Sequence, residues 1–200
     1  MRVALIVPVK SFAIAKGRLA SVMSEDARAQ LAKECATRVL LAAGTWPTYV
    51  VCDDDDVTQW ATQHGATVVH CTQPGINAAV RAGRDQALRD GIDHVVIAHG
   101  DLPLAHRFDH VVVDNTITLV PDRHHDGTNV LALPATSPFE TTYGPQSFHR
   151  HVEQAHTLGL AHVIIEDEEL SLDIDTADDV AELQTRGQSA SNAKTQGSNT

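Results

Sequence analysis

Asp101 is the first residue whose type and position suggest chemistry. It follows the apolar run of residues 95–98 and precedes Pro103. A continuous Val/Ile run is typical of a strand buried on both faces of a parallel sheet. Open α/β sheets bind their ligands at the carboxyl ends of such strands. Asp101 is therefore a candidate ligand for a magnesium ion that bridges phosphates, with a turn or helix cap as the alternative.

A basic loop at residues 10–18 is the second candidate group. It follows the strand predicted at residues 2–9 and carries Lys10, Lys16 and Arg18. Three cations close together in an acidic protein favour a nucleotide-binding site that cradles a polyphosphate. The alternative is a solvated surface loop. A long loop after the first strand favours the phosphate hypothesis.

Asp173 and Asp175 form the third group, late in the chain. Their alternate spacing places both carboxylates on one face of an extended segment. With Asp101 they could hold one or two divalent cations that neutralise triphosphate oxygens and orient an in-line attack. Lys16 and Arg18 would stabilise the charge that develops on the departing pyrophosphate. No acid or base residue is needed, because phosphoryl chemistry depends mainly on positioning and charge stabilisation.

Composition limits the classes of function. The 200 residues fit one domain, and the net charge of −11 argues against a nucleic-acid partner. The cysteines form no C-x-x-C pair, which suits a reducing cytoplasm. No apolar run approaches membrane-spanning length, and neither a Walker A motif nor G-x-G-x-x-G occurs. P-loop NTPases and dinucleotide dehydrogenases are therefore disfavoured.

Strand and helix patterns alternate along the chain and predict an α/β fold. The domain is expected over residues 1–185, with residues 186–200 as a disordered tail, because the latter are polar and lack apolar periodicity. Asn77 opens a helix, either as a cap or as a nucleotide contact. The expected strands are 2–9, 48–52, 67–71, 95–98, 116–120, 130–133 and 161–165, and the expected helices are 24–44, 57–64, 77–89, 147–158 and 177–183.

Two histidine pairs have a metal-like appearance: His124 with His125, and His149 with His151. Neither pair has companions at the spacing of zinc ligands. We therefore expect these side chains to be exposed to solvent or to line the substrate site.

Taken together and in order, the motifs from residue 1 to about residue 183 resemble one family. It comprises the 2-phospho-L-lactate and phosphoenolpyruvate guanylyltransferases of deazaflavin coenzyme F-420 biosynthesis. The motifs are Val7-Pro8-Val9-Lys10, Ala15-Lys16-Gly17-Arg18-Leu19, Gly75-Ile76-Asn77, Gly100-Asp101-Leu102-Pro103-Leu104, Pro121-Asp122-Arg123, Gly127-Thr128-Asn129, Tyr143-Gly144-Pro145-Gln146-Ser147-Phe148 and Asp173-Ile174-Asp175-Thr176.

The resemblance implies a glycosyltransferase-A-type nucleotidyltransferase fold, a mostly parallel mixed sheet flanked by helices. It implies GTP and magnesium, with the metal at Asp101, Asp173 and Asp175. It also implies that Thr128, Gly144 and Ser147 contact a small phosphorylated carboxylic acid. Phosphoenolpyruvate is the expected acceptor and 2-phospho-L-lactate the alternative. A homodimer is an open option, and no membrane partner is expected.

Two other classes remain as alternatives. Molybdopterin and sugar-phosphate nucleotidyltransferases usually begin with a glycine-rich loop, and residues 7–10 replace those glycines here. A non-catalytic module that binds guanine nucleotides is the other alternative. The three aspartates argue against such a module, and binding measurements beside a pyrophosphate-release assay would separate it from an enzyme.

Overall fold

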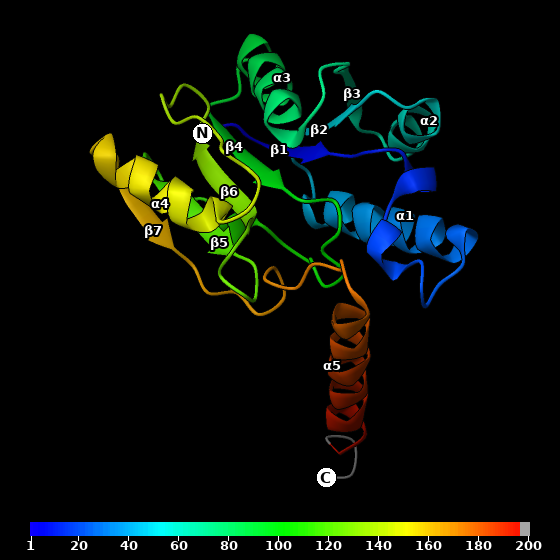
Figure 1. Ribbon diagram of the computed structural model, residues 1–200. Helices are drawn as coiled ribbons and strands as arrows, with labels where there is room; N and C mark the ends of the chain where they lie inside the picture. Colours follow the sequence, from blue (N-terminus) through cyan, green and yellow to red (C-terminus); the bar gives the residue numbers. More distant parts are fainter. Residues whose placement is uncertain (197–200) are drawn as a thin grey trace.

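The computed structural model describes residues 1–196, with side chains described up to residue 186. These residues contain one seven-stranded sheet. The strand order is β3-β2-β1-β4-β6-β5-β7 (Figure 1). Neighbouring strands are parallel except that β6 runs antiparallel to both β4 and β5. The strands are β1 (Val3–Pro8), β2 (Thr48–Cys52), β3 (Thr67–His70), β4 (His94–Ala98), β5 (Ile117–Pro121), β6 (Thr128–Pro134) and β7 (His162–Ile164).

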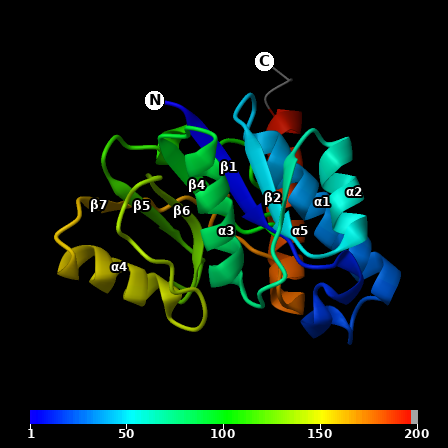
Figure 2. The ribbon, with the colours of Figure 1, turned by 90° about the horizontal axis from the view of Figure 1, so that it is seen from above.

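Helices cover both faces of the sheet (Figures 1 and 2). On one face, α1 (Glu25–Ala42) and α2 (Asp55–Gln63) pack against alternate strand residues such as Leu5 and Val96. On the other face, α3 (Ile76–Arg89) and α4 (Ser147–Thr157) pack against the intervening residues, such as Ile97. The near-continuous Val/Ile/Ala strands follow from this, because central strands are buried on both faces.

Local signals account for several element boundaries. The Ser24 hydroxyl accepts a hydrogen bond from the backbone N–H of the third residue of α1, and Asp54 caps α2 in the same manner. Gly83 lets α3 lie close to the sheet, because a Cβ atom there would come within 2.6 Å of Ile6 Cγ2. No helix in the described part of the chain is long and apolar enough to cross a membrane.

The expected strands and helices are confirmed, with small shifts in their ends, and three details differ. Gly75, not Asn77, precedes the first turn of α3. Residues 170–176 form a loop rather than a strand. The last helix, α5 (Ala177–Gln196), extends well beyond residue 183. Residues 186–196, where the sequence predicts a disordered tail, continue this helix, and residues 197–200 lie outside the described residues.

The physical reason for the longer helix lies at its start. Thr176 and Asp179 exchange hydrogen bonds as an N-terminal capping pair, which offsets the cost of helix nucleation. Alanine and glutamine then recur along the segment, and both residues favour a helix even without an apolar stripe.

The topology gathers the candidate residues at one edge of the sheet. Strands β1 and β4 are parallel, so the loops that follow them leave from the same edge. Because β6 is antiparallel to β4, its first residue, Thr128, lies at that edge as well. The segments that begin at residues 9, 99 and 122 therefore all leave from this edge.

Candidate active site

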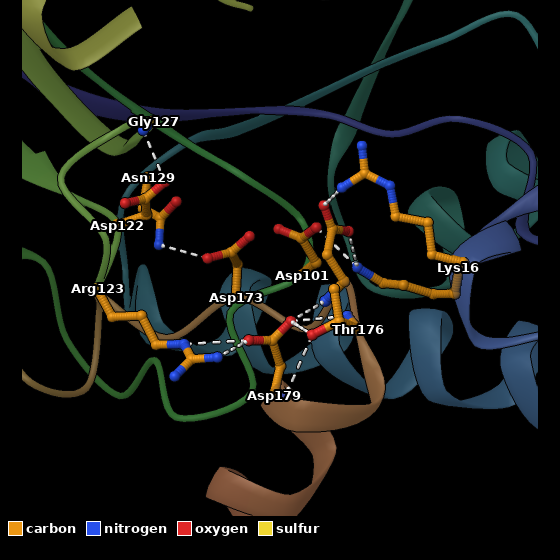
Figure 3. Close-up of polar contacts among 11 residues, drawn as sticks. Lys16, Asp101, Asp122, Arg123, Gly127, Asn129, Asp173, Thr176 and Asp179 are labelled. Carbon is orange, nitrogen blue, oxygen red and sulfur yellow. Dashed lines mark hydrogen bonds and ion pairs between the residues drawn. The ribbon is translucent and has the colours of Figure 1, made fainter. Parts of the chain in front are cut away.

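Asp101, Asp173 and Asp175 converge at the carboxyl edge of the sheet, and Figure 3 shows Asp101 and Asp173 side by side there. One carboxylate oxygen of each lies within 4.8 Å of the others. Asp101 lies in the loop after β4, and the other two lie between β7 and α5. The backbone N–H of Ile174 donates to the Asp101 carbonyl at 3.2 Å, which joins the two segments. The structure thus brings together all three predicted metal ligands.

The electrostatics of this cluster fit a divalent cation. Burial, together with the nearby Asp101 carboxylate, raises the pKa of Asp173 to about 7, although a hydrogen bond from Asn129 opposes the shift. Asp101 Oδ1 is buried and has no hydrogen-bond partner among the described residues. Hard oxygen ligands with unsatisfied negative charge are what Mg²⁺ and Ca²⁺ bind in proteins.

Lys16 lies directly against the carboxylates. Its Nζ is 2.7 Å from Asp101 Oδ2 and 3.5 Å from Asp175 Oδ1, and its side chain is 6% exposed. Burial lowers the pKa of Lys16, but the two carboxylates outweigh burial and the net shift is upward. Lys16 has the left-handed φ of 57° between two short 3-10 helices, Phe12–Ile14 and Gly17–Leu19. Such a conformation is costly for a residue with a Cβ and is concentrated at functional sites.

The other two basic residues of this loop are open to solvent. Arg18 reaches Asp175 Oδ2 at 3.5 Å, and its side chain is 77% exposed. Lys10, directly after β1, is also exposed. The loop therefore offers one buried cation beside the carboxylates and two exposed cations farther out.

An ion pair that the sequence did not reveal holds this site in shape. Arg123 donates to Asp179 Oδ1 from Nε at 3.1 Å and from Nη2 at 2.5 Å. Asp179 Oδ2 accepts the N–H groups of Asp175 at 3.0 Å and of Thr176 at 2.7 Å. Asp179 is thus a positioning residue for Asp175. The spacing of Thr176 and Asp179 is typical of a helix N-terminal cap, but no sequence signal linked either residue to Arg123.

Asp122 shapes the loop between β5 and β6. Its carboxylate accepts the backbone N–H groups of His124, Asp126 and Gly127 at 2.8, 3.0 and 2.6 Å. This compact turn places Thr128 and Asn129 at the start of β6, and the Asn129 amide donates to Asp173 Oδ1 at 3.3 Å.

The three residues expected to contact the acceptor are also brought together. The Thr128 N–H donates to Ser147 Oγ at 3.2 Å, and both side chains are buried. Gly144 lies three residues before Ser147, has a φ of +131° and is exposed. The Ser147 N–H donates to the Gly144 carbonyl at 3.0 Å. The strand start and the helix start therefore form one corner beside the carboxylates.

Asn77 has a structural contact that the sequence did not predict. Its Oδ1 accepts the Tyr143 N–H at 2.8 Å, and its Nδ2 donates to the Tyr143 carbonyl at 3.2 Å. The amide thus pins the loop that carries Gly144. A nucleotide contact by Asn77 remains a prediction.

Comparison with known proteins shows the family of this chain. The family model described as "Guanylyl transferase CofC like" matches residues 2–195. The chain belongs to this family. As a CofC-like protein it is a guanylyltransferase, that is, a nucleotidyltransferase.

Named relatives of this CofC-like chain differ in their acceptors. It is 36% identical over 187 residues to the phosphoenolpyruvate guanylyltransferase of Sphaerobacter thermophilus, covering 89% of this chain and 90% of the relative. It is 34% identical to the 3-phospho-D-glycerate guanylyltransferase of Phenylobacterium zucineum, covering 84% of each. A solved nucleotidyl transferase from Methanothermobacter thermautotrophicus has a TM-score of 0.67 at 14% identity, covering 92% of this chain and 97% of that one. This likeness confirms the expected nucleotidyltransferase fold.

Proposed function

We propose that this protein joins the GMP moiety of GTP to the phosphate of phosphoenolpyruvate in deazaflavin coenzyme F-420 biosynthesis, and releases pyrophosphate. The observation that carries the proposal is the convergence of Asp101, Asp173 and Asp175 beside Lys16. A carboxylate cluster with an adjacent buried cation suits a triphosphate, because one part holds the metal and the other contacts phosphate oxygens.

A bound metal would supply charge neutralisation. Asp101, Asp173 and Asp175 would hold magnesium, which when bound polarises the phosphate oxygens of GTP. Asn129 and Asp179 keep two of these carboxylates in place through the contacts described above.

The basic loop acts on the departing group. An oxygen of the acceptor phosphate attacks the α-phosphorus of GTP, and the bond from that phosphorus to the bridging oxygen of pyrophosphate breaks. Lys16, Arg18 and Lys10 stabilise the negative charge that builds up on pyrophosphate. The acceptor phosphate is ionised at neutral pH, so no side chain must remove a proton from it.

The acceptor's carboxylate end is assigned to Thr128, Gly144 and Ser147. The helix dipole at the start of α4 favours an anion, and the Gly144 N–H just before this helix has no acceptor among the described residues. Two named relatives use phosphoenolpyruvate and 3-phospho-D-glycerate, and both acids pair a phosphate with a carboxylate. We favour phosphoenolpyruvate, as named for the relative at 36% identity. 2-Phospho-L-lactate is the alternative acceptor.

A direct test offers the purified protein GTP and magnesium with phosphoenolpyruvate, 2-phospho-L-lactate or 3-phospho-D-glycerate in turn. Pyrophosphate release and the mass of the adduct are measured. Phosphoenolpyruvate should give the fastest turnover. Faster turnover with either of the other acids would refute phosphoenolpyruvate as the acceptor but would still support guanylyl transfer. Tight GTP binding without turnover of any acid would favour a binding module.

Asp101→Asn tests the metal site in the same assay. It should remove most of the turnover while leaving the fold intact, because one carboxylate of the cluster loses its charge. Asp109→Asn is the matched control, because Asp109 is exposed and forms an ion pair with Arg107 at the surface. A wild-type rate for Asp101→Asn at low magnesium would refute the assignment.

A further inference from the structure

His151 is a buried histidine of α4 that bridges two segments of the chain. Its side chain is fully buried, with 0% exposure. Its Nε2 accepts the backbone N–H of Thr142 at 2.9 Å, and its Nδ1 lies 2.9 Å from Thr128 Oγ1. Both ring nitrogens therefore have partners within the protein.

The two partners determine where the ring carries its proton. Because Nε2 accepts an N–H, the neutral imidazole has its hydrogen on Nδ1 and donates it to the Thr128 hydroxyl. Burial, aided by the nearby Arg150 and His99, lowers the pKa of His151 to about 4, so the ring is neutral at pH 7. The buried Thr128 hydroxyl accepts this hydrogen bond and ties His151 to the start of β6.

The same histidine helps to hold the loop that carries Gly144. Asn77 holds Tyr143 on one side, His151 holds the Thr142 N–H, and Arg150 donates to the carbonyls of Thr142 and Pro145. Gly144 lies between these anchored residues. Its N–H has no acceptor among the residues that the structure describes.

This loop also touches the strand that leads to the carboxylates. The Tyr143 ring has its centroid 5.1 Å from that of His151 and 5.2 Å from that of His99. His99 is two residues before Asp101, at the end of β4. His151 thus joins the start of β6 to the loop that carries Gly144.

We propose that His151 is a positioning residue that anchors the Gly144 loop to Thr128 at the start of β6, and so presents the Gly144 N–H to the carboxylate of the phosphorylated acceptor. The inference rests on the proposed function and adds to it a residue that determines acceptor affinity without touching the acceptor. One lost donor of this kind is worth about 1.5 kcal/mol or more, which is roughly a tenfold change in affinity.

His151→Phe tests the proposal, because it keeps an aromatic ring among Tyr143 and Phe139 and removes both hydrogen bonds. The KM for phosphoenolpyruvate should rise about tenfold, while the KM for GTP changes less than about twofold. The same substitution at the exposed His149, two residues away on α4, should change neither KM.

A merely structural role would give a different pattern. It would lower the melting temperature and kcat while leaving the KM for phosphoenolpyruvate unchanged, and this result would overturn the inference. A double-mutant cycle with Thr128→Val adds a second measure. The two effects on acceptor KM should be less than additive, whereas full additivity would contradict the proposed coupling.

Two further arms keep the test decisive. If His151→Phe does not fold, His151→Gln keeps a polar side chain that can accept the Thr142 N–H, and it should still raise the acceptor KM by losing Thr128. An unchanged acceptor KM in His151→Gln would overturn this inference but not the proposed function. Absence of turnover in the wild-type protein would overturn the proposed function and this inference together.

Discussion

The buried carboxyl of Asp173 should make the metal-free protein less stable as the pH rises. Its folded-state pKa is about 7, because burial and the neighbouring Asp101 disfavour its charge. In the unfolded chain the group ionises near its ordinary value of 3.8. The stabilising contribution is therefore full below pH 3.8 and is lost as the pH rises through about 7.

The size of this effect follows from the two pKa values. A difference of about three pH units corresponds to about 4 kcal/mol of free energy of unfolding. Asp173→Asn removes the charge and keeps an oxygen that can accept the hydrogen bond from Asn129. In a chain of this length, the variant should melt about 10 °C above the wild type at pH 8 and close to it at pH 4.

Thermal unfolding at pH 4 and pH 8 in the presence of a chelator measures this difference. Asp175→Asn is the matched control, because the Asp175 carboxylate is 47% exposed and faces Lys16 and Arg18. It should not gain stability at pH 8. Adding magnesium should stabilise the wild type and not Asp173→Asn. Equal melting temperatures of Asp173→Asn and the wild type at pH 8 would refute the reasoning.

Three other substitutions have clear expected outcomes. Lys16→Ala should raise the KM for GTP at least tenfold, by analogy with other charged contacts, and leave the acceptor KM unchanged. Arg18→Ala should have a smaller effect, because the Arg18 side chain is exposed. Unchanged kinetics for both substrates would show that the basic loop is a solvated surface loop. Asp179→Ala should lower the free energy of unfolding by about 3 kcal/mol and raise the magnesium requirement, because Arg123 loses its ion-pair partner and the Asp175 N–H loses its acceptor. The control Asp178→Ala, on the same turn, should lower the free energy of unfolding by less than about 1 kcal/mol. Gly83→Ala should destabilise by about 2 kcal/mol in denaturant unfolding, because its Cβ would clash with Ile6; a stabilised variant would contradict this packing.

The Asp179 effect should also depend on pH. Burial opposes ionisation of Asp179, but the N–H groups of Asp175 and Thr176, the Thr176 hydroxyl and Arg123 outweigh it and hold its pKa below the ordinary value. Its contribution to stability is therefore present at neutral pH and is lost as the pH falls through the folded-state pKa. The stability gap between the wild type and Asp179→Ala should shrink in acid, and a constant gap would argue against the ion pair as its source.

The sequence by itself determined the features that depend on neighbouring residues. The bounds of β2, the caps at Ser24 and Asp54, and the place of Asp101 after a buried strand all follow from patterns a few residues long. Hydrophobic periodicity and capping act over one or two turns, so they can be read without the fold. The position of Asp101 at the carboxyl edge also follows, since strand ends meet at one edge of a sheet. Asp173 and Asp175 lie in the loop between β7 and α5, and the tertiary contact of Ile174 with Asp101 brings them to that edge.

The tertiary structure alone decided which distant side chains pair. Arg123 meets Asp179 56 residues later, and Thr128 meets His151 23 residues later. Asn77, a candidate cap in the sequence, is instead hydrogen-bonded to Tyr143. Such contacts depend on the order and direction of the strands and on the packing of α3 and α4, which no local pattern encodes. The sequence could therefore identify the charged groups of the site, whereas only the fold could show which residues hold them in position.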